Sequence, residues 1–144
     1  MNKKRKVLGL VLAGMVLFGV FGLLQYQITH TKKVLTETVE RNLDKFIGKA
    51  GSLEPESLMM QYASLLAARD AYIVLQNQNL FFRENPDPSL AHLINKIHQM
   101  MKKDPERFQS FFRQEGMGMR LYKLMDDFSN EQLVHDLYKE LKEY

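Results

Sequence analysis

The sequence predicts an all-α fold, in which an N-terminal transmembrane helix precedes a small domain of about five helices. Three observations support this fold class. One long uncharged apolar run lies near the N-terminus, and the apolar residues after it recur at steps of three and four, the spacing of a helix face. No stretch shows the sustained two-residue alternation of a strand.

The apolar run, residues 7–24, carries no charged side chain. At about 1.5 Å per residue it covers about 27 Å, and continuing to Ile28 brings it to about 33 Å, enough to cross a bilayer. Four cations at positions 3–6 precede it, and only Lys32 and Lys33 follow closely. The positive-inside rule therefore places the N-terminus in the cytoplasm. We expect a single-pass protein of a bacterial-type inner membrane, with its C-terminal domain extracytoplasmic.

A cleaved signal peptide is the competing interpretation, with Val20 and Gly22 as the small residues before a cut. The apolar run exceeds a typical signal-peptide core and continues through Leu23 and Leu24, which favours an uncleaved anchor. The predicted organisation is a cytoplasmic basic tail (1–6), an anchor in the lipid bilayer (7–28), a helical stalk (29–47) and an α-helical extracytoplasmic domain (48–144).

Each later helix is predicted from its apolar spacing and its end signals. The stalk has its apolar residues at helical steps and ends before Gly48. A second helix begins at Pro55 and runs to Phe82 or Arg83, before the prolines of residues 85–88 break it. Its predicted inward stripe is Leu58, Tyr62, Leu65, Leu66 and Ile73, and in a longer version Leu80.

A third helix begins at Pro88 or Ser89 and has an almost one-sided apolar pattern: Leu90, Leu93, Ile94, Ile97, Met100 and Met101. Asp104 and Pro105 predict the N-cap and first position of a short fourth helix that ends by Gly116. A fifth follows Gly118. Ser129 and Gln132 form a capping-box pattern for the last helix. We expect Ile94, Ile97 and Leu137 in the core.

One internal similarity offers an alternative arrangement of these helices. Residues 80–85 resemble residues 110–116, and the apolar positions that follow each segment align. Two helix–turn–helix units stacked as in an α-solenoid would produce such a pattern, and so would two amphipathic helices by chance.

Charge and cysteine content exclude several classes of function. The chain has 20 Lys and Arg against 17 Asp and Glu, and removing the four cations of positions 3–6 leaves 16 against 17. We therefore expect no concentrated basic surface and no nucleic-acid partner. The absence of cysteine excludes disulfides, thiolate zinc sites and a cysteine nucleophile.

Two candidate sites remain. His98 and Met101 are three residues apart on one helix, and an imidazole with a thioether suits Cu(I) or Ag(I); the ordinary alternative is a core methionine beside a surface histidine. The adjacent pairs Phe81–Phe82 and Phe111–Phe112 are the protein-contact candidates. Consecutive residues project about 100° apart around a helix, so we expect at least one of the four to be exposed. Catalytic residues and cofactors are not predicted.

The function predicted from the sequence is a non-enzymatic structural or accessory subunit. It makes contacts with other membrane or periplasmic proteins in a membrane-bound assembly of the envelope transport or secretion type, or acts as a tethered chaperone. The first alternative is a soft-metal handling periplasmic protein that uses His98 and Met101, and the second is a hydrolase.

Overall fold

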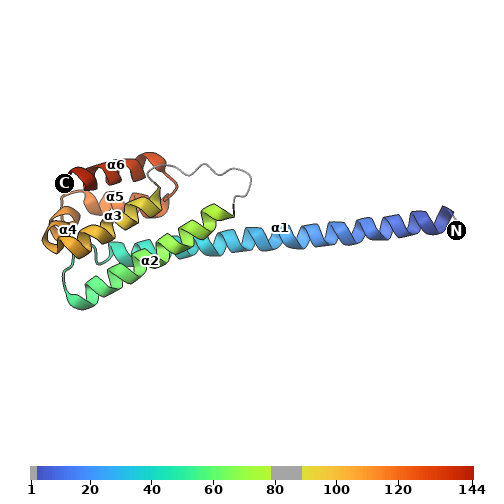
Figure 1. Cartoon of the computed structure of the whole chain (residues 1–144), viewed down its shortest axis with the longest axis horizontal. Helices are drawn as coiled ribbons and strands as arrows, with labels where there is room; N and C mark the ends of the chain where they lie inside the picture. Colours follow the sequence, from blue (N-terminus) through green and yellow to red (C-terminus); the bar gives the residue numbers. More distant parts are fainter. Residues whose placement is uncertain (1–2, 79–88) are drawn as a thin grey trace. The chain divides into compact units, whose positions relative to one another are not determined.

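The computed structural model describes residues 3–78 and 89–144, with side chains from Leu12 onward, and all regular structure in these residues is α-helical. The prediction of an all-α fold is therefore confirmed for the described part of the chain. The helices are α1 (Lys3–Ile47), α2 (Pro55–Asn77), α3 (Leu90–Lys103), α4 (Pro105–Phe112), α5 (Met117–Asp126) and α6 (Glu131–Glu143) (Figure 1). The chain divides into two compact units, Met1–Val34 and Leu35–Tyr144.

The first unit consists of the N-terminal part of α1. Its apolar side chains from Leu12 to Ile28 have no neighbours to bury them, and Phe18 is 80% exposed. By length and composition, α1 is the one helix in the described residues that could cross a membrane. An apolar helix surface of this kind is stable in lipid and unfavourable in water.

The second unit begins at Leu35, so the last turns of α1 belong to it. Val39, Leu43 and Phe46 are buried in its core, which means that part of the segment expected to be a stalk is a core helix. As predicted, α1 ends at Ile47, directly before Gly48. The loop after it needs a glycine at position 51, where φ is +76° and an added Cβ would lie 3.3 Å from the Phe112 Cβ.

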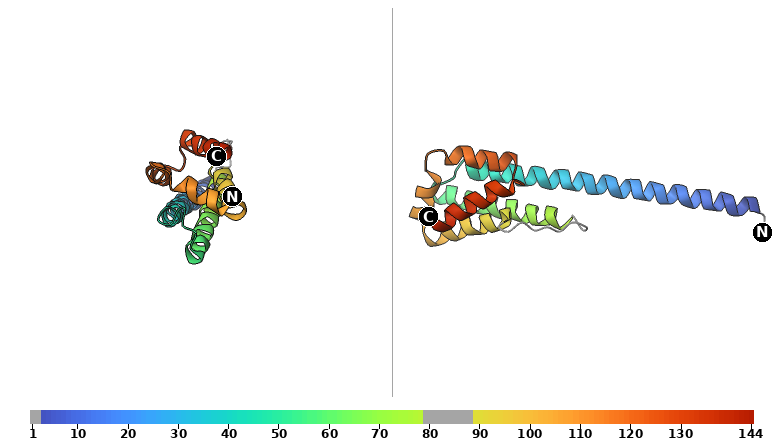
Figure 2. Two further views of the ribbon diagram at one scale, coloured as in Figure 1. Left: turned by 90° about the vertical axis from the view of Figure 1, so that its left-hand side faces the viewer. Right: turned by 90° about the horizontal axis from the view of Figure 1, so that it is seen from above.

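Helix α3 lies between α2 and α6 and also packs against α4 (Figures 1 and 2). Its predicted inward residues are all buried: Leu90, Leu93, Ile94, Ile97, Met100 and Met101. The core prediction for Ile94, Ile97 and Leu137 is confirmed. Side chains of α1, α2, α3 and α5 meet around one small apolar cavity, among them Leu43, Leu65, Ile94 and Leu121.

Some of the other helix ends agree with the sequence and others differ. Asp104 caps α4 as predicted, because its Oδ1 accepts a hydrogen bond from the Arg107 backbone N–H at 3.1 Å. The predicted capping box of the last helix is wrong: the N-cap of α6 is Asn130, whose Oδ1 accepts from the Leu133 N–H, while the Ser129 hydroxyl donates to Asp127. Helix α2 ends at Asn77, earlier than predicted.

Candidate functional site

The predicted contact site at Phe111 and Phe112 is not an exposed surface. Phe111 is 1% exposed and Phe112 is 7% exposed, so neither of these two is the exposed phenylalanine expected among the four. Phe81 and Phe82 lie outside the described residues.

Both phenylalanines are buried because the short helix α4 is covered on two sides. The Phe112 ring meets the Phe46 ring of α1 edge-on at 5.4 Å, and the Phe111 ring meets the Tyr144 ring at 5.1 Å. Phe108 completes the cluster at 4.9 Å from Phe112. Consecutive side chains project about 100° apart, but here both directions are covered, by Phe46 and by Tyr144, while Glu106, Arg107 and Ser110 lie on the exposed side of α4.

Helix α2 instead carries the exposed apolar surface of the second unit. Its buried side holds small and polar residues together with two large ones: Ser57, Gln61, Ser64, Leu65, Ala68, Ala71 and Tyr72. Tyr62 and Ile73, both predicted to face inward, are exposed at 44% and 41%. The predicted phase of this helix is therefore wrong in part, because its apolar residues are divided between two faces.

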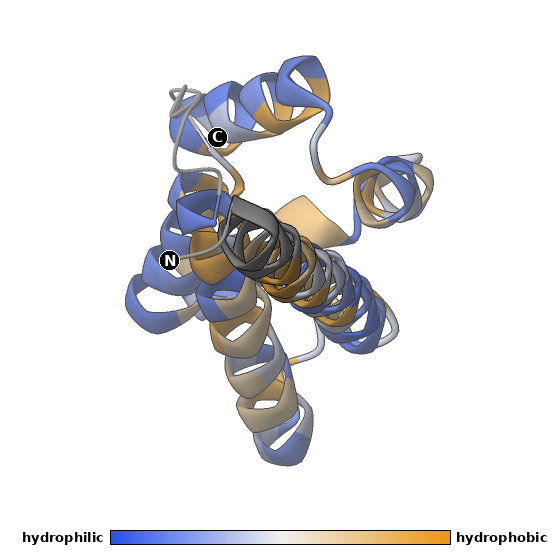
Figure 3. Cartoon of the chain, turned by 90° about the vertical axis from the view of Figure 1, so that its right-hand side faces the viewer, coloured by the Kyte–Doolittle hydropathy of each residue, from blue (hydrophilic) through white to orange (hydrophobic). Residues whose placement is uncertain are grey.

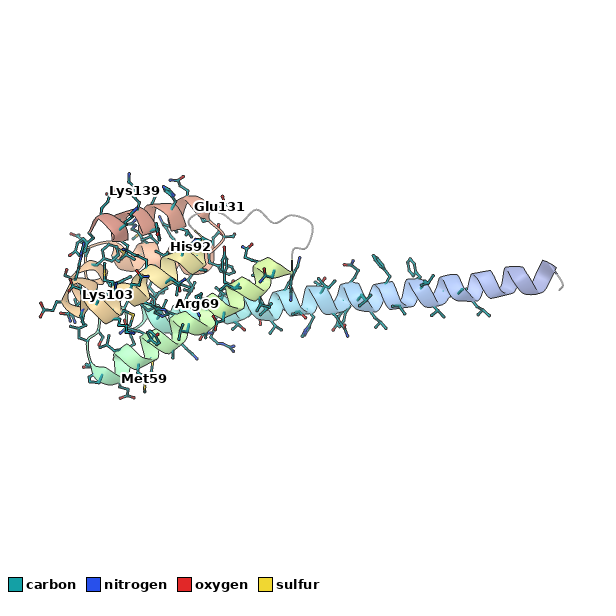
Figure 4. The ribbon with its side chains drawn as sticks, viewed as in Figure 1. Met59, Arg69, His92, Lys103, Glu131 and Lys139 are labelled. Atoms are coloured by element: carbon teal, nitrogen blue, oxygen red, sulfur yellow. The ribbon has the colours of Figure 1, made fainter. Side chains whose placement is uncertain are left out.

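We call the outward side the outer α2 face. Its exposed or half-buried members are Met59, Met60, Ala63, Leu66, Ala67, Asp70, Ile73, Val74 and Asn77. Figure 3 shows the mixed hydropathy of α2, the lowest helix in that view, and Figure 4 labels Met59 on its outer side. Met59 is 71% exposed, the largest value for any large apolar side chain among the described residues beyond Val34. At about 1.5 Å per residue, the 23 residues of α2 make a face about 34 Å long.

The order of residues along this face follows a heptad. Met59, Ala63, Leu66, Asp70, Ile73 and Asn77 are separated by steps of four, three, four, three and four. This is the spacing of positions that insert between the side chains of a second helix. The large residues Met59, Leu66 and Ile73 recur every seven residues, with small or polar residues between them.

Polar groups fix α2 in this orientation. Gln61 is fully buried, and its Nε2 donates to the backbone oxygens of Ser52 (2.9 Å) and Ser57 (3.1 Å). At the edge of the outer α2 face, the Arg69 guanidinium binds Asp70 Oδ1 at 2.9 Å and Asn95 Oδ1 of α3 at 3.0 Å. Rotating α2 to bury its apolar face would break the contacts to Ser52 and Asn95, which lie outside this helix, and unpaired buried polar groups are costly.

The candidate metal ligands His98 and Met101 are both buried in α3, at 8% and 7% exposure. The His98 ring lies against the Tyr62 ring at 4.5 Å, and its Nε2 has no hydrogen-bond partner. Burial lowers the pKa of His98, and the nearby Arg69 charge lowers it further, against a smaller opposing effect of the Tyr62 backbone. The described residues contain no group of three or more His, Cys, Asp or Glu positioned to hold a metal ion. The surface location considered for His98 is wrong.

Comparison of the chain with protein-family models, curated proteins and solved structures finds no match. The exposed apolar face of α2 was not identified from the sequence, although the 4-3-4-3 spacing from position 59 was present in it. Leu65 belongs to the buried stripe of α2 and the adjacent Leu66 to the outer one. Because the two stripes meet at this pair, the apolar pattern alone does not separate them.

Proposed function

We propose that this protein is a membrane-anchored, non-enzymatic accessory subunit whose outer α2 face docks against a helix of a partner protein. The observation that carries the proposal is the exposed apolar face of α2 with its heptad spacing. Contiguous exposed apolar surface marks interaction sites in folded proteins. A helix is the occupant that we propose, because large side chains at every seventh residue can insert between the side chains of a second helix.

The size of the face favours a partner that shares the membrane. A strip about 34 Å long and about 10 Å wide, the diameter of a helix, covers roughly 340 Å². A stable interface covers about 800 Å² per partner, so docking through α2 alone is weak. Anchoring both proteins in one bilayer raises their effective concentration and compensates for a small interface.

The apolar start of α1 supplies the anchor in this proposal, through residues 7–28 in the lipid bilayer. The basic residues 3–6 favour an N-terminus in the cytoplasm and a domain on the extracytoplasmic side of a bacterial-type inner membrane. The partner is then another membrane or periplasmic protein of an envelope assembly.

Site-specific photo-crosslinking in cells tests this proposal. A photoreactive residue is placed singly at Met59, Ala63, Leu66 and Ile73, with Met119 of α5 as the control. Met119 is 68% exposed against 71% for Met59, so the two positions are matched in residue type and exposure. We expect crosslinks to one partner from the α2 positions and none from Met119.

The sites crosslinked on the partner distinguish a helix from other occupants. A helical partner gives attachment sites spaced three and four residues apart, in an order that follows the order of the α2 positions. Crosslinks to a second copy of this chain, to lipid, or at equal yield from Met119 would overturn the proposal.

A further inference from the structure

A groove between α3, α4 and α6 collects positive charge in a unit that is otherwise acidic. It has a volume of about 180 Å³ and is lined by Lys96, Gln99, Met100, Lys103, Asp104, Arg107, Leu141 and Lys142. Residues 35–144 hold 14 Lys and Arg against 17 Asp and Glu, a net charge of −3. The groove has four cations and one carboxylate, so its local charge is +3, opposite in sign to the net charge of the unit.

None of these four cations has a carboxylate partner in the part of the chain that the structure describes. The ion pairs there join Arg69 with Asp70, Arg120 with Glu140 and Lys139 with Glu143. Lys96, Lys103, Arg107 and Lys142 form no such pair.

The one carboxylate in the groove does not neutralise the cations by direct contact, because it has a structural role. Asp104 caps α4 and accepts the Arg107 backbone N–H. Cations held near one another without a counter-charge repel, and such an arrangement lowers stability unless an anion is present.

Arg107 is held in place at the rim of this groove. Its guanidinium carbon lies 5.7 Å from the centroid of the Tyr144 ring, in cation–π geometry. The Tyr144 ring in turn packs edge-on against Phe111, and its hydroxyl is hydrogen-bonded to the Ser110 hydroxyl. An arginine oriented in advance loses less freedom when it binds an anion, and its planar fork matches two oxygens of a phosphate or carboxylate.

The groove combines an apolar floor with cations around it. Met100 and Leu141, both buried, form an apolar floor, while Lys103, Arg107 and Lys142 are exposed around it. Lys103 projects from the end of α3 in Figure 4. The volume of about 180 Å³ leaves room for a phosphate group between these side chains.

We propose that this groove is a binding site for a phosphate group, carried either by a small phosphate ester or by the headgroup of an anionic lipid. Three lysines supply point charges and Arg107 supplies a bidentate fork, a combination that suits the several oxygens of a phosphate. The site lies on α3, α4 and α6 and is independent of the outer α2 face, so neither proposal depends on the other.

Titration of the full chain in an uncharged maltoside detergent tests the shared chemistry. Inorganic phosphate and glycerol 3-phosphate are the probes, chloride keeps the ionic strength constant, and the melting temperature reports binding. We expect saturable stabilisation, and the double variant Lys103→Gln/Arg107→Gln should weaken binding about tenfold or more. Without phosphate, this variant should melt at or above the temperature of the unmodified chain, because it relieves repulsion.

The matched control is Lys123→Gln/Lys139→Gln, which removes the same number of charges away from the groove. Lys123 lies among Asp126, Asp127 and Asp136, and Lys139 pairs with Glu143. Phosphate affinity should stay within about twofold in this control. Absence of saturable binding, or an equal loss of affinity in the control, would overturn the proposal.

A second arm identifies the source of the phosphate group. The full chain is placed in nanodiscs of phosphatidylcholine with and without phosphatidylglycerol. If a lipid headgroup occupies the groove, the affinity for added phosphate falls only in discs that contain the anionic lipid. If the affinity is equal in both, the ligand is a soluble phosphate ester. Both results support the site.

Discussion

Truncating one inner and one outer side chain of α2 gives the sharpest test of the orientation of this helix. Leu65 is fully buried and Met59 is 71% exposed. Replacing a buried leucine with alanine costs about 2–5 kcal/mol from lost burial and the cavity that remains. Replacing an exposed side chain costs less than about 0.5 kcal/mol. Because Leu, Met and Ala are all good helix formers, differences in helix propensity contribute little to either value.

The measurement is thermal unfolding of the full chain in detergent, followed by near-ultraviolet circular dichroism, which reports tertiary packing around the aromatic residues of the second unit. For a unit of this size, 1 kcal/mol corresponds to about 4 °C in melting temperature. We expect Leu65→Ala to lower the melting temperature by about 8–20 °C and Met59→Ala by no more than about 2 °C.

The reverse order of these effects would refute the reasoning. If Met59→Ala were the more damaging change, the apolar stripe from position 59 would be the buried side of α2. The outer α2 face would then not exist, and the proposed partner contact would lose its basis. Equal small effects would indicate that α2 is not packed on the rest of the unit.

The remaining predictions concern topology, pH and metal binding. A periplasm-active reporter fused after Tyr144 should be active; activity only of a cytoplasm-active reporter would contradict the orientation inferred from residues 3–6. Burial lowers the pKa of His98 in the folded state, so its contribution to stability is complete above pH 6.5 and decreases as the pH falls below that value. Urea unfolding between pH 5 and 7 should show this loss for the unmodified chain and not for His98→Asn; the same slope in both would assign the effect to other groups. Because His98 and Met101 are buried, we expect no Cu(I) site of micromolar or tighter affinity, and a saturable site abolished by His98→Ala would favour the metal-handling alternative.

The elements that the sequence predicted well are those in which one physical signal dominates. In α3 the large apolar residues fall on a single stripe, and all of that stripe is buried. The α4 cap was predictable because Asp104 followed by Pro105 satisfies both the capping and the first-position preferences. Such local signals do not depend on which other helix lies nearby.

The N-cap of α6 could not be predicted from the capping-box pattern alone, because two adjacent residues can each serve as the cap. Ser129 and Asn130 are adjacent, and both residue types are good N-caps. The Ser129 hydroxyl is used instead by Asp127 in the preceding turn, at 2.6 Å, which leaves Asn130 to accept the Leu133 N–H. The sequence contains both possibilities, and a local side-chain contact selects one.

The contact site and the basic groove required tertiary information. Phe111 and Phe112 are covered by residues 46 and 144, which are distant in the sequence. The groove takes Lys96 and Lys103 from α3, Arg107 from α4 and Lys142 from α6. A charge count over the whole chain averages such residues with the surrounding carboxylates, so it concealed the local excess.

The packing of α2 places small residues on its inner side and larger apolar residues on its outer side. Ser57, Ser64, Ala68 and Ala71 on the inner side are small, which allows α2 to approach its neighbours closely, but they provide little apolar area for burial. Met59 and Ile73 would contribute more if they faced inward. A helix that turns larger apolar residues outward gives up that stabilisation within its own chain. This arrangement is favourable when another helix buries the outer residues, and a heptad spacing is the pattern that such a helix would fit.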